Sequence, residues 1–271
     1  MTVIARRSRA AARNKYLIPQ AREKNEGNVG WINRALENLP LKSIQRHSFV
    51  LLIGGADPLS FRLRLAQAHV RSDLSPSSWS GASFISVQDK SANKDTEVVN
   101  VSLSPRTWYP PHGFAPICNA IQTDTLAHFD SPKRFPNLAL LVWPVAGDAI
   151  QKSLAQLRRE RIAIDLSSLM LRWMGYAWGC GVPSNPLGEG FGMPSAAMLE
   201  TAFAANGFDL TPGLESRSSC PRRFGNRRAG GTNTTARTRE SRSTSTAHIP
   251  ASIISSIHRI FRATRVDSAM A

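Results

Sequence analysis

The residues best placed to do chemistry lie in residues 183–220, where a loop rich in glycine and proline leads into a helical pattern. Pro194 suits the first turn of a helix, where its missing N–H is not needed. Ser195 would then stand at the helix N-terminus, where free backbone N–H groups favour a nucleophile or a bound anion. The structural alternative is a loop before a packed helix, because apolar residues such as Met198 and Phe203 share one face. Ser195 is therefore the candidate catalytic residue.

A serine nucleophile needs a general base, and histidines are the first candidates. These are His69, His112 and His128, and their spacing places none of them beside Ser195. A lone histidine is more often a structural residue than a catalytic one. Cys220 is a further candidate, because its Ser-Cys-Pro context resembles the start of a helix and would also suit a nucleophile.

The three cysteines lie far apart, at positions 118, 180 and 220, and form no C-x-x-C pair. This pattern argues against structural zinc and indicates a reducing compartment, so we expect a cytoplasmic protein. The sequence has no Walker loop, dinucleotide fingerprint or metal-ligand spacing, which argues against NTPases, Rossmann enzymes and metallohydrolases. We expect no cofactor. We also expect no membrane span, because no apolar run reaches about 18 residues.

Positive charge gathers toward the end of the chain. The formal net charge is +15, and residues 221–271 hold ten Arg, no Lys and two acidic residues. A disordered tail that binds nucleic acid weakly and without specificity is the usual interpretation of such a run. The first residues are also basic, and an aperiodic, flexible leader is expected there.

Arg without Lys is also what a GC-rich gene yields when it is translated out of frame. With suitably chosen codons, a nucleotide string that encodes PEAIWQSASGWHEYYRE encodes residues 221–237 after the loss of one C. The recovered string has apolar residues at helical spacing, with a proline at its first turn. We therefore hypothesise that the chain is frameshifted near Cys220 and that residues 221–271 are not an evolved domain.

The sequence divides into three segments. Residues 1–40 are expected to be a basic flexible leader, residues 41–215 an α+β domain, and residues 216–271 a tail that is disordered or out of frame. Strand candidates come before most helix candidates in the domain, which favours α+β over a regular βαβ series. The strands are expected at 48–53, 82–87, 97–103 and 135–145, and the helices at 31–39, 59–70, from 148 onward, at 166–178 and at 195–206.

Two stretches together carry a resemblance to a known family. They are residues 64–85 (RLAQAHVRSDLSPSSWSGASFI) and residues 194–211 (PSAAMLETAFAANGFDLT). Their order resembles the circularly permuted papain-like cysteine amidases and peptidases. In that family a Ser-His pair opens an early strand of a small barrel, and the nucleophilic Cys begins a later helix. The resemblance covers about residues 48–212, and it implies a small antiparallel sheet or barrel with packed helices.

The chain departs from the family at both reactive positions. Gly81 stands where the family's His would fall, and Ser195 stands where its Cys would fall. A papain-type mechanism needs a thiolate activated by an adjacent imidazole. The resemblance therefore implies a degenerate member without hydrolase activity, whose partner would be a peptide or acyl ligand. Two alternatives stay open, an active acyl-transfer hydrolase that uses Ser195 and a nonspecific nucleic-acid-binding protein that uses its basic termini.

Overall fold

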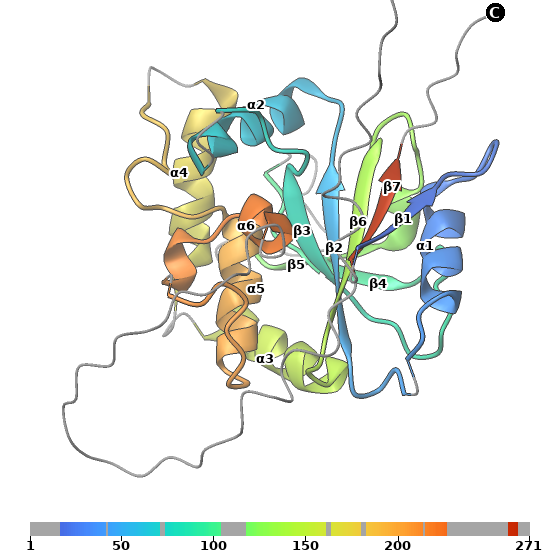
Figure 1. Ribbon diagram of the computed structural model, residues 1–271. Coiled ribbons are helices and arrows are strands. Elements are labelled where there is room, and N and C mark those ends of the chain that lie inside the picture. Colours follow the sequence, from blue (N-terminus) through green and yellow to red (C-terminus); the bar gives the residue numbers. More distant parts are fainter. Residues whose placement is uncertain are drawn as a thin grey trace, which may run out of the picture.

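The protein folds as a seven-stranded sheet with helices on both faces (Figure 1). The computed structural model describes residues 17–41, 43–70, 74–103, 118–160, 164–179, 183–213, 215–226 and 260–264. The strand order is β1-β7-β6-β2-β3-β4-β5, and the pairs are antiparallel except β1 with β7. The α+β class predicted from the sequence is confirmed.

The strands are β1 (Leu17–Ala21), β2 (Ser48–Gly54), β3 (Gly81–Ile85), β4 (Glu97–Asn100), β5 (Gln122–Thr125), β6 (Asn137–Trp143) and β7 (Ile260–Thr264). The α-helices are α1 (Asn28–Glu37), α2 (Pro58–Ala66), α3 (Gly147–Arg159), α4 (Leu166–Trp178), α5 (Pro194–Ala204) and α6 (Pro221–Asn226). Three short 3₁₀ turns complete the described elements: η2 (Gln67–Val70), η4 (Leu126–Phe129) and η5 (Ser216–Ser218).

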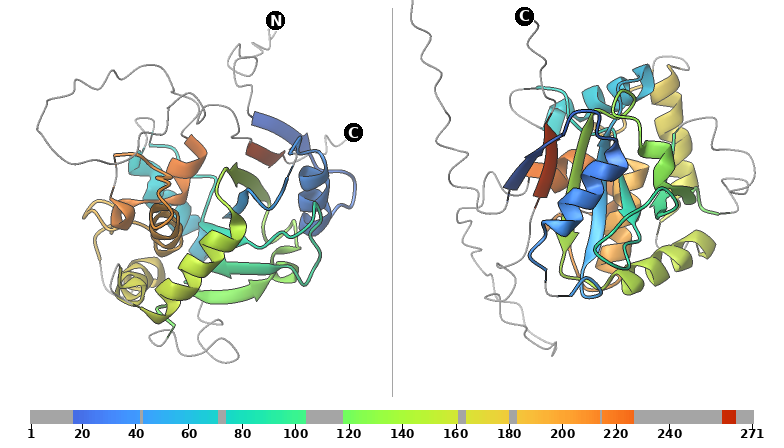
Figure 2. Two further views of the ribbon diagram at one scale, coloured as in Figure 1. Left: turned by 90° about the horizontal axis from the view of Figure 1, so that it is seen from below. Right: turned by 90° about the vertical axis from the view of Figure 1, so that its right-hand side faces the viewer.

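Strand β2 lies at the centre of the sheet, between β3 and β6, and all seven of its residues are buried. Successive side chains of a strand point to opposite faces. Val50 and Leu52 therefore join the core under α2–α6, whereas Phe49 and Leu51 join the core under α1 and η4. A strand covered on both faces needs apolar residues at every position, which is why SFVLLI stands out in the sequence. Figure 2 shows the two helical layers on either side of the sheet.

The fold begins before residue 41, which differs from the expected boundary. Trp31 and Ile32 of α1 are fully buried against the sheet, and the Trp31 indole N–H donates to the carbonyl oxygen of Gln20 at 3.0 Å. Residues 17–40, which the sequence assigned to a flexible leader, thus supply β1 and α1. The helix expected at residues 31–39 corresponds to α1, whose buried apolar residues fall on one face. Residues 1–16 lie outside the described residues.

Helix α5 passes through the middle of the larger core. Nine of its eleven residues are buried, because α3, α4 and β3 all pack against it. It starts at Pro194, as the proline rule predicts, and Met193 at the N-cap makes no side-chain capping bond. The chain that enters α5 is held by a bond from the N–H of Met193 to the carbonyl of Ser219 at 2.8 Å. This bond ties the entry of α5 to the segment just before α6.

Parts of the predicted tail belong to the described fold. Phe224 of α6 is 1% exposed, and the Arg222 guanidinium donates to the carbonyl and hydroxyl oxygens of Ser75. Strand β7 lies between β1 and β6 (Figure 1). Residues 227–259 and 265–271, where most of the predicted disordered tail falls, lie outside the described residues. The frameshift hypothesis stays a prediction.

Candidate functional site

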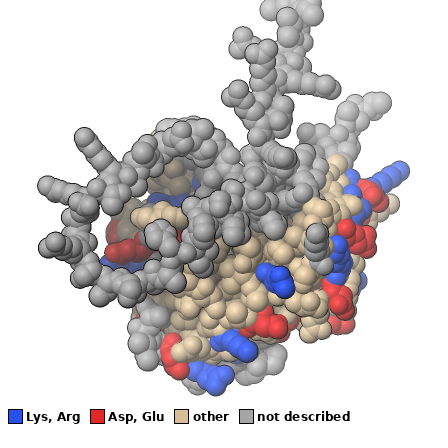
Figure 3. Space-filling model, turned by 60° about the horizontal axis from the view of Figure 1, so that its bottom comes forward, with Lys and Arg blue, Asp and Glu red and all other residues tan. Residues whose placement is uncertain are grey.

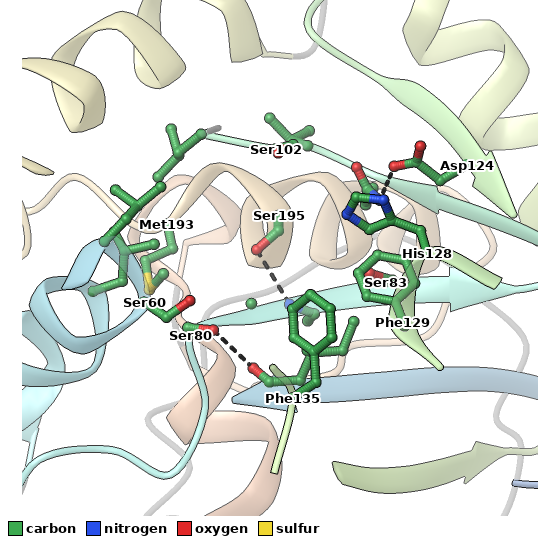
Figure 4. Close-up of a pocket in the computed structure, with 18 of the residues that line it drawn as sticks. Ser60, Ser80, Ser83, Ser102, Asp124, His128, Phe129, Phe135, Met193 and Ser195 are labelled. Atoms are coloured by element: carbon green, nitrogen blue, oxygen red, sulfur yellow. Dashed lines mark hydrogen bonds between the residues drawn. The ribbon is translucent and has the colours of Figure 1, made fainter. Parts of the chain in front are cut away.

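A cavity of about 150 Å³ opens at the N-terminus of α5 (Figure 4). Its lining comes from α2, β3, β4, β5, η4 and the entry to α5. The polar lining includes Ser83, Asn100, Asp124, His128 and Ser195. The apolar walls include Leu59, Leu63, Phe129, Phe135 and Met193. A concave site with apolar walls and a few convergent polar groups is the usual form of a small-ligand site.

The candidate nucleophile Ser195 lies in this cavity and is 5% exposed. Its hydroxyl oxygen accepts a hydrogen bond from the backbone N–H of Ala82 on β3, at 3.3 Å. This bond joins the helix start to the strand, as Figure 4 shows. The Ser195 hydroxyl keeps its own proton available for donation, because a hydroxyl both accepts and donates.

Gly81 faces Ser195 across the cavity. A Cβ atom placed on Gly81 would have one neighbour within 4 Å outside its own stretch of chain, the Ser195 hydroxyl oxygen at 3.9 Å. The two positions singled out by the family resemblance, 81 and 195, are therefore neighbours in the fold. Neither carries the residue type that thiol chemistry would require.

His128 and Asp124 line the same cavity as Ser195. They come from η4 and β5, and Figure 4 shows them together to one side of Ser195. Partial burial lowers the pKa of His128; the charge of Asp124 opposes this effect and that of Arg134 adds to it. His128 is therefore mostly neutral at pH 7. No hydrogen bond joins it to Ser195 in the described part of the chain.

The other histidine candidates are not in this site. His69 lies on η2 and does not line the cavity. His112 falls within residues 104–117, outside the described residues. The structure thus places Ser195 and His128 in the lining of one cavity. The sequence named both residues but could not relate their positions.

Sequence reasoning missed two buried polar residues of the cavity, Ser83 and Asn100. Asn100 is 6% exposed, and its Nδ2 donates to Asp124 Oδ2 at 3.0 Å, while its Oδ1 has no hydrogen-bond partner among the described residues. Ser83 is 3% exposed. The signal in the sequence is Asn100 itself, a polar residue next to the valines of β4. Because buried polar groups are normally paired, a polar residue in a buried strand indicates a partner or a ligand nearby.

The remaining candidate nucleophile, Cys220, is fully buried in the larger core. Burial raises the pKa of its thiol, and hydrogen bonds and the charge of Arg223 oppose this effect only in part. A buried thiol with a raised pKa is inert, because the thiolate is the nucleophile. Cys220 is thus a packing residue. No group of three or more His, Cys, Asp or Glu side chains that could hold a metal ion occurs among the residues that the structure describes.

Comparisons with known proteins add no relative. No protein-family model, curated protein or solved structure matches the chain. Within the described residues, no helix has both the length and the apolar character needed to cross a bilayer. The resemblance to permuted papain-like enzymes accordingly stays a prediction.

Proposed function

We propose that the protein is a degenerate papain-like domain, whose cavity holds a peptide or acyl ligand without hydrolysing it. One observation carries this proposal: a Cβ atom at position 81 would lie 3.9 Å from the Ser195 hydroxyl oxygen. A base and a nucleophile need such a juxtaposition, in which they lie within hydrogen-bond reach. The backbone supports a catalytic pair, and Gly81 supplies no base.

The chemistry of Ser195 supports binding over hydrolysis. A serine hydroxyl is a weak nucleophile unless an adjacent base takes its proton. The hydrogen bond that Ser195 accepts from Ala82 draws electron density from the same oxygen. A neutral hydroxyl at a helix N-terminus can instead hold the carbonyl oxygen of a ligand.

The test rebuilds the missing pair. Wild-type protein, the single variants Ser195→Cys and Gly81→His, and the double variant are incubated with an alkylating thiol probe between pH 5 and 8. The double variant should react faster at pH 6 than Ser195→Cys alone, because the new imidazole lowers the thiol pKa. Wild-type protein should resist a serine-directed fluorophosphonate. Robust labelling of wild-type Ser195 would overturn the proposal.

An active acyl-transfer hydrolase is the second candidate, favoured by the presence of Ser195, His128 and Asp124 in one cavity. Movement of η4 would have to bring the His128 ring to the Ser195 hydroxyl. Turnover of small ester and amide substrates is measured for wild type, Ser195→Ala and His128→Ala. This candidate requires that both variants lose activity; unchanged turnover in Ser195→Ala removes it.

The nucleic-acid alternative gains no support from the face of the described residues in Figure 3. On the face shown in Figure 3, basic and acidic side chains are interspersed and form no continuous basic patch. Two of the described cations, Arg34 and Arg172, are paired with Glu26 and Glu189. Phosphate-binding surfaces cluster their Lys and Arg residues. The alternative therefore depends on the termini outside the described residues.

A further inference from the structure

Glu200 is a buried carboxyl group that does not line the cavity and that joins three parts of the chain. It belongs to α5 and is 1% exposed. Its Oε1 accepts the backbone N–H of Thr211 at 2.9 Å, and its Oε2 accepts the hydroxyl of Ser219 at 3.4 Å. The side chain of Asp209 is also hydrogen-bonded to it. A bond between two carboxyl groups needs one proton, and burial favours the neutral form of Glu200.

Ser219 connects this carboxyl group with the entry to the cavity. Its side chain donates to Glu200, and its backbone carbonyl accepts the N–H of Met193 at 2.8 Å. Met193 lines the cavity together with Ser195, two residues further along the chain. A Cβ atom on Gly192 would collide with the Ser219 backbone, so the two stretches of backbone are in direct contact. A displacement of Ser219 would therefore reach the wall of the cavity.

The charges around Glu200 oppose its ionisation. The negative charge of Asp209 acts on it and disfavours a second carboxylate there. No cation forms an ion pair with Glu200 among the residues that the structure describes. Strand β3, which packs against α5, has no titratable residue. Charged or titratable side chains of the other neighbouring elements are Asp148, Lys152, Arg158 and Arg159 of α3, Arg172 of α4 with its partner Glu189, Tyr176 of α4, Arg217 of η5 with its partner Glu215, Cys220, and Arg222 and Arg223 of α6.

We propose that Glu200 is a positioning residue of the cavity, whose proton holds the 209–211 turn and Ser219 against α5 and thereby keeps Met193 in place. Loss of this proton sets two carboxylates against each other and loosens the entry to α5. The cavity is therefore ordered at acidic pH and loosens as the pH rises. This inference deepens the proposed function and rests on it, because it describes the regulation of the same ligand site.

The direction of the effect follows from where each state keeps the proton. When the contact around Glu200 opens, the carboxyl group reaches water and takes its ordinary pKa of 4.5, whereas burial in the closed state raises the pKa to about 7. Between these two values, opening releases a proton, so the opening equilibrium constant grows about tenfold per pH unit. The growth totals at most roughly 300-fold and ends above pH 7, where both states are ionised.

Amide hydrogen exchange measures this opening at individual residues. Wild-type protein is followed by NMR between pH 5 and 8, and each rate is compared with the intrinsic rate at that pH to give a protection factor. Thr211 reports the bond to Glu200, and Met193 reports the entry to the cavity. Leu51, in the central strand, reports global unfolding. Protection of Thr211 and Met193 should fall together, by about tenfold per pH unit up to pH 7, and stay below that of Leu51.

Two variants test whether the carboxyl group is the cause. Glu200→Gln keeps an acceptor for the Thr211 N–H but has no proton to lose, so protection of Thr211 and Met193 should not change with pH. The matched control is Glu215→Gln, the same substitution at a side chain that is 66% exposed in the stretch between the turn and Ser219. It should keep the pH dependence of the wild type.

Ser219→Ala separates the two ends of the connection. It removes the hydroxyl that donates to Glu200 and keeps the carbonyl that accepts from Met193. Protection of Thr211 should still depend on pH, whereas protection of Met193 should not. Thermal unfolding verifies that each variant is folded. If Glu200→Gln does not fold, the wild type and Ser219→Ala still decide the question.

Three results would overturn the inference. Equal protection of Met193 and Leu51 at every pH would mean that Glu200 acts on global stability alone. An unchanged pH dependence of Met193 in Glu200→Gln, or in Ser219→Ala, would exclude the proposed connection. The proposed function fails on a different result, the hydrolysis of a substrate by wild-type Ser195, which amide exchange does not measure. An inactive protein with pH-independent protection refutes the regulation alone, and a hydrolytic protein whose protection depends on Glu200 refutes the proposed function alone.

Discussion

Replacing Glu200 with glutamine should remove most of the loss of stability that the protein suffers between pH 5 and 8. Glu200 lies on α5 and is 1% exposed. Its Oε1 accepts the N–H of Thr211 at 2.9 Å, and Ser219 donates its hydroxyl to Oε2 at 3.4 Å. Burial raises the pKa of Glu200 to about 7; the Thr211 bond opposes this effect, and Asp209 adds to it.

The size and sign of the effect follow from proton linkage. Between the ordinary pKa of 4.5 and the folded value of about 7, the folded chain keeps a proton that the unfolded chain has released. Stability therefore falls as the pH rises through this window. At about 1.4 kcal/mol per pKa unit, the shift from 4.5 to about 7 gives a loss of at most about 4 kcal/mol. For a chain of this size that corresponds to a drop in Tm of at most roughly 8–16 °C.

Glutamine imitates the protonated carboxyl group. Its amide oxygen can still accept from Thr211, and its NH₂ group can donate to Asp209. Thermal unfolding of wild type and Glu200→Gln is followed by circular dichroism from pH 5 to 8.5, with Glu37→Gln, at an exposed position, as the matched control. The Tm of wild type and of the control should fall together, and that of Glu200→Gln should fall less. Parallel curves for wild type and Glu200→Gln would refute the reasoning.

Three further predictions concern the loop before α5 and the end of the domain. Gly192→Ala would place a Cβ against the backbone oxygen of Ser219, so urea unfolding should show a loss of about 1–3 kcal/mol, whereas Gly175→Ala on α4, where an added Cβ would meet nothing within 4 Å, should show none. Trp173→Phe removes the indole N–H that donates to the carbonyl of Gly192 at 2.6 Å; we expect a loss of about 1–3 kcal/mol in the same assay, and a loss below about 0.5 kcal/mol would contradict the importance of that bond. The gene's nucleotide sequence across residues 221–271 should show a second open frame that encodes a helix-like string; stop codons in that frame would end the frameshift hypothesis.

The central strands could be predicted from the sequence, and the short strands β1, β5 and β7 could not. Runs of apolar residues predicted β2 and β6, because a strand covered on both faces has no polar positions. Strand β5 reads QTDT, so its pairing with β4, and not its composition, makes it a strand. Strand β7, which lies between β1 and β6, falls within the sequence assigned to a tail. Such short strands depend on partners far away in the chain.

The sequence named two residues of the candidate cavity, Ser195 and His128, and missed Asn100 and Ser83. Ser195 could be found because a proline and glycines mark the start of its helix. Asn100 and Ser83 gain significance only when the β3–β4 pairing and η4 close a cavity over them. His128 was a candidate base, but the sequence could not show that it lies near Ser195, because no spacing rule connects a 3₁₀ turn with a helix N-terminus. Local patterns locate helix ends, whereas tertiary packing decides which polar residues meet.

One side chain of α6, Arg223, bears on the hypothesis of an alternative reading frame. Arg223 is partly buried, and its Nε has no hydrogen-bond partner among the described residues. The recovered string PEAIWQSASGWHEYYRE would place alanine at this position and isoleucine at the buried position of Phe224. An apolar helix would leave no unpaired Nε in that part of the core.

The place of β7 in the sheet has a consequence for the order of assembly during translation. Strand β1 is hydrogen-bonded to β7, and β7 to β6. A ribosome releases β1 long before it has synthesised residue 264, so β1 cannot take its final place until then. The antiparallel strands between residues 48 and 143 can pair earlier, and β6 then presents an open edge. A pause in translation before residue 260 would prolong the interval in which that edge could pair with another chain.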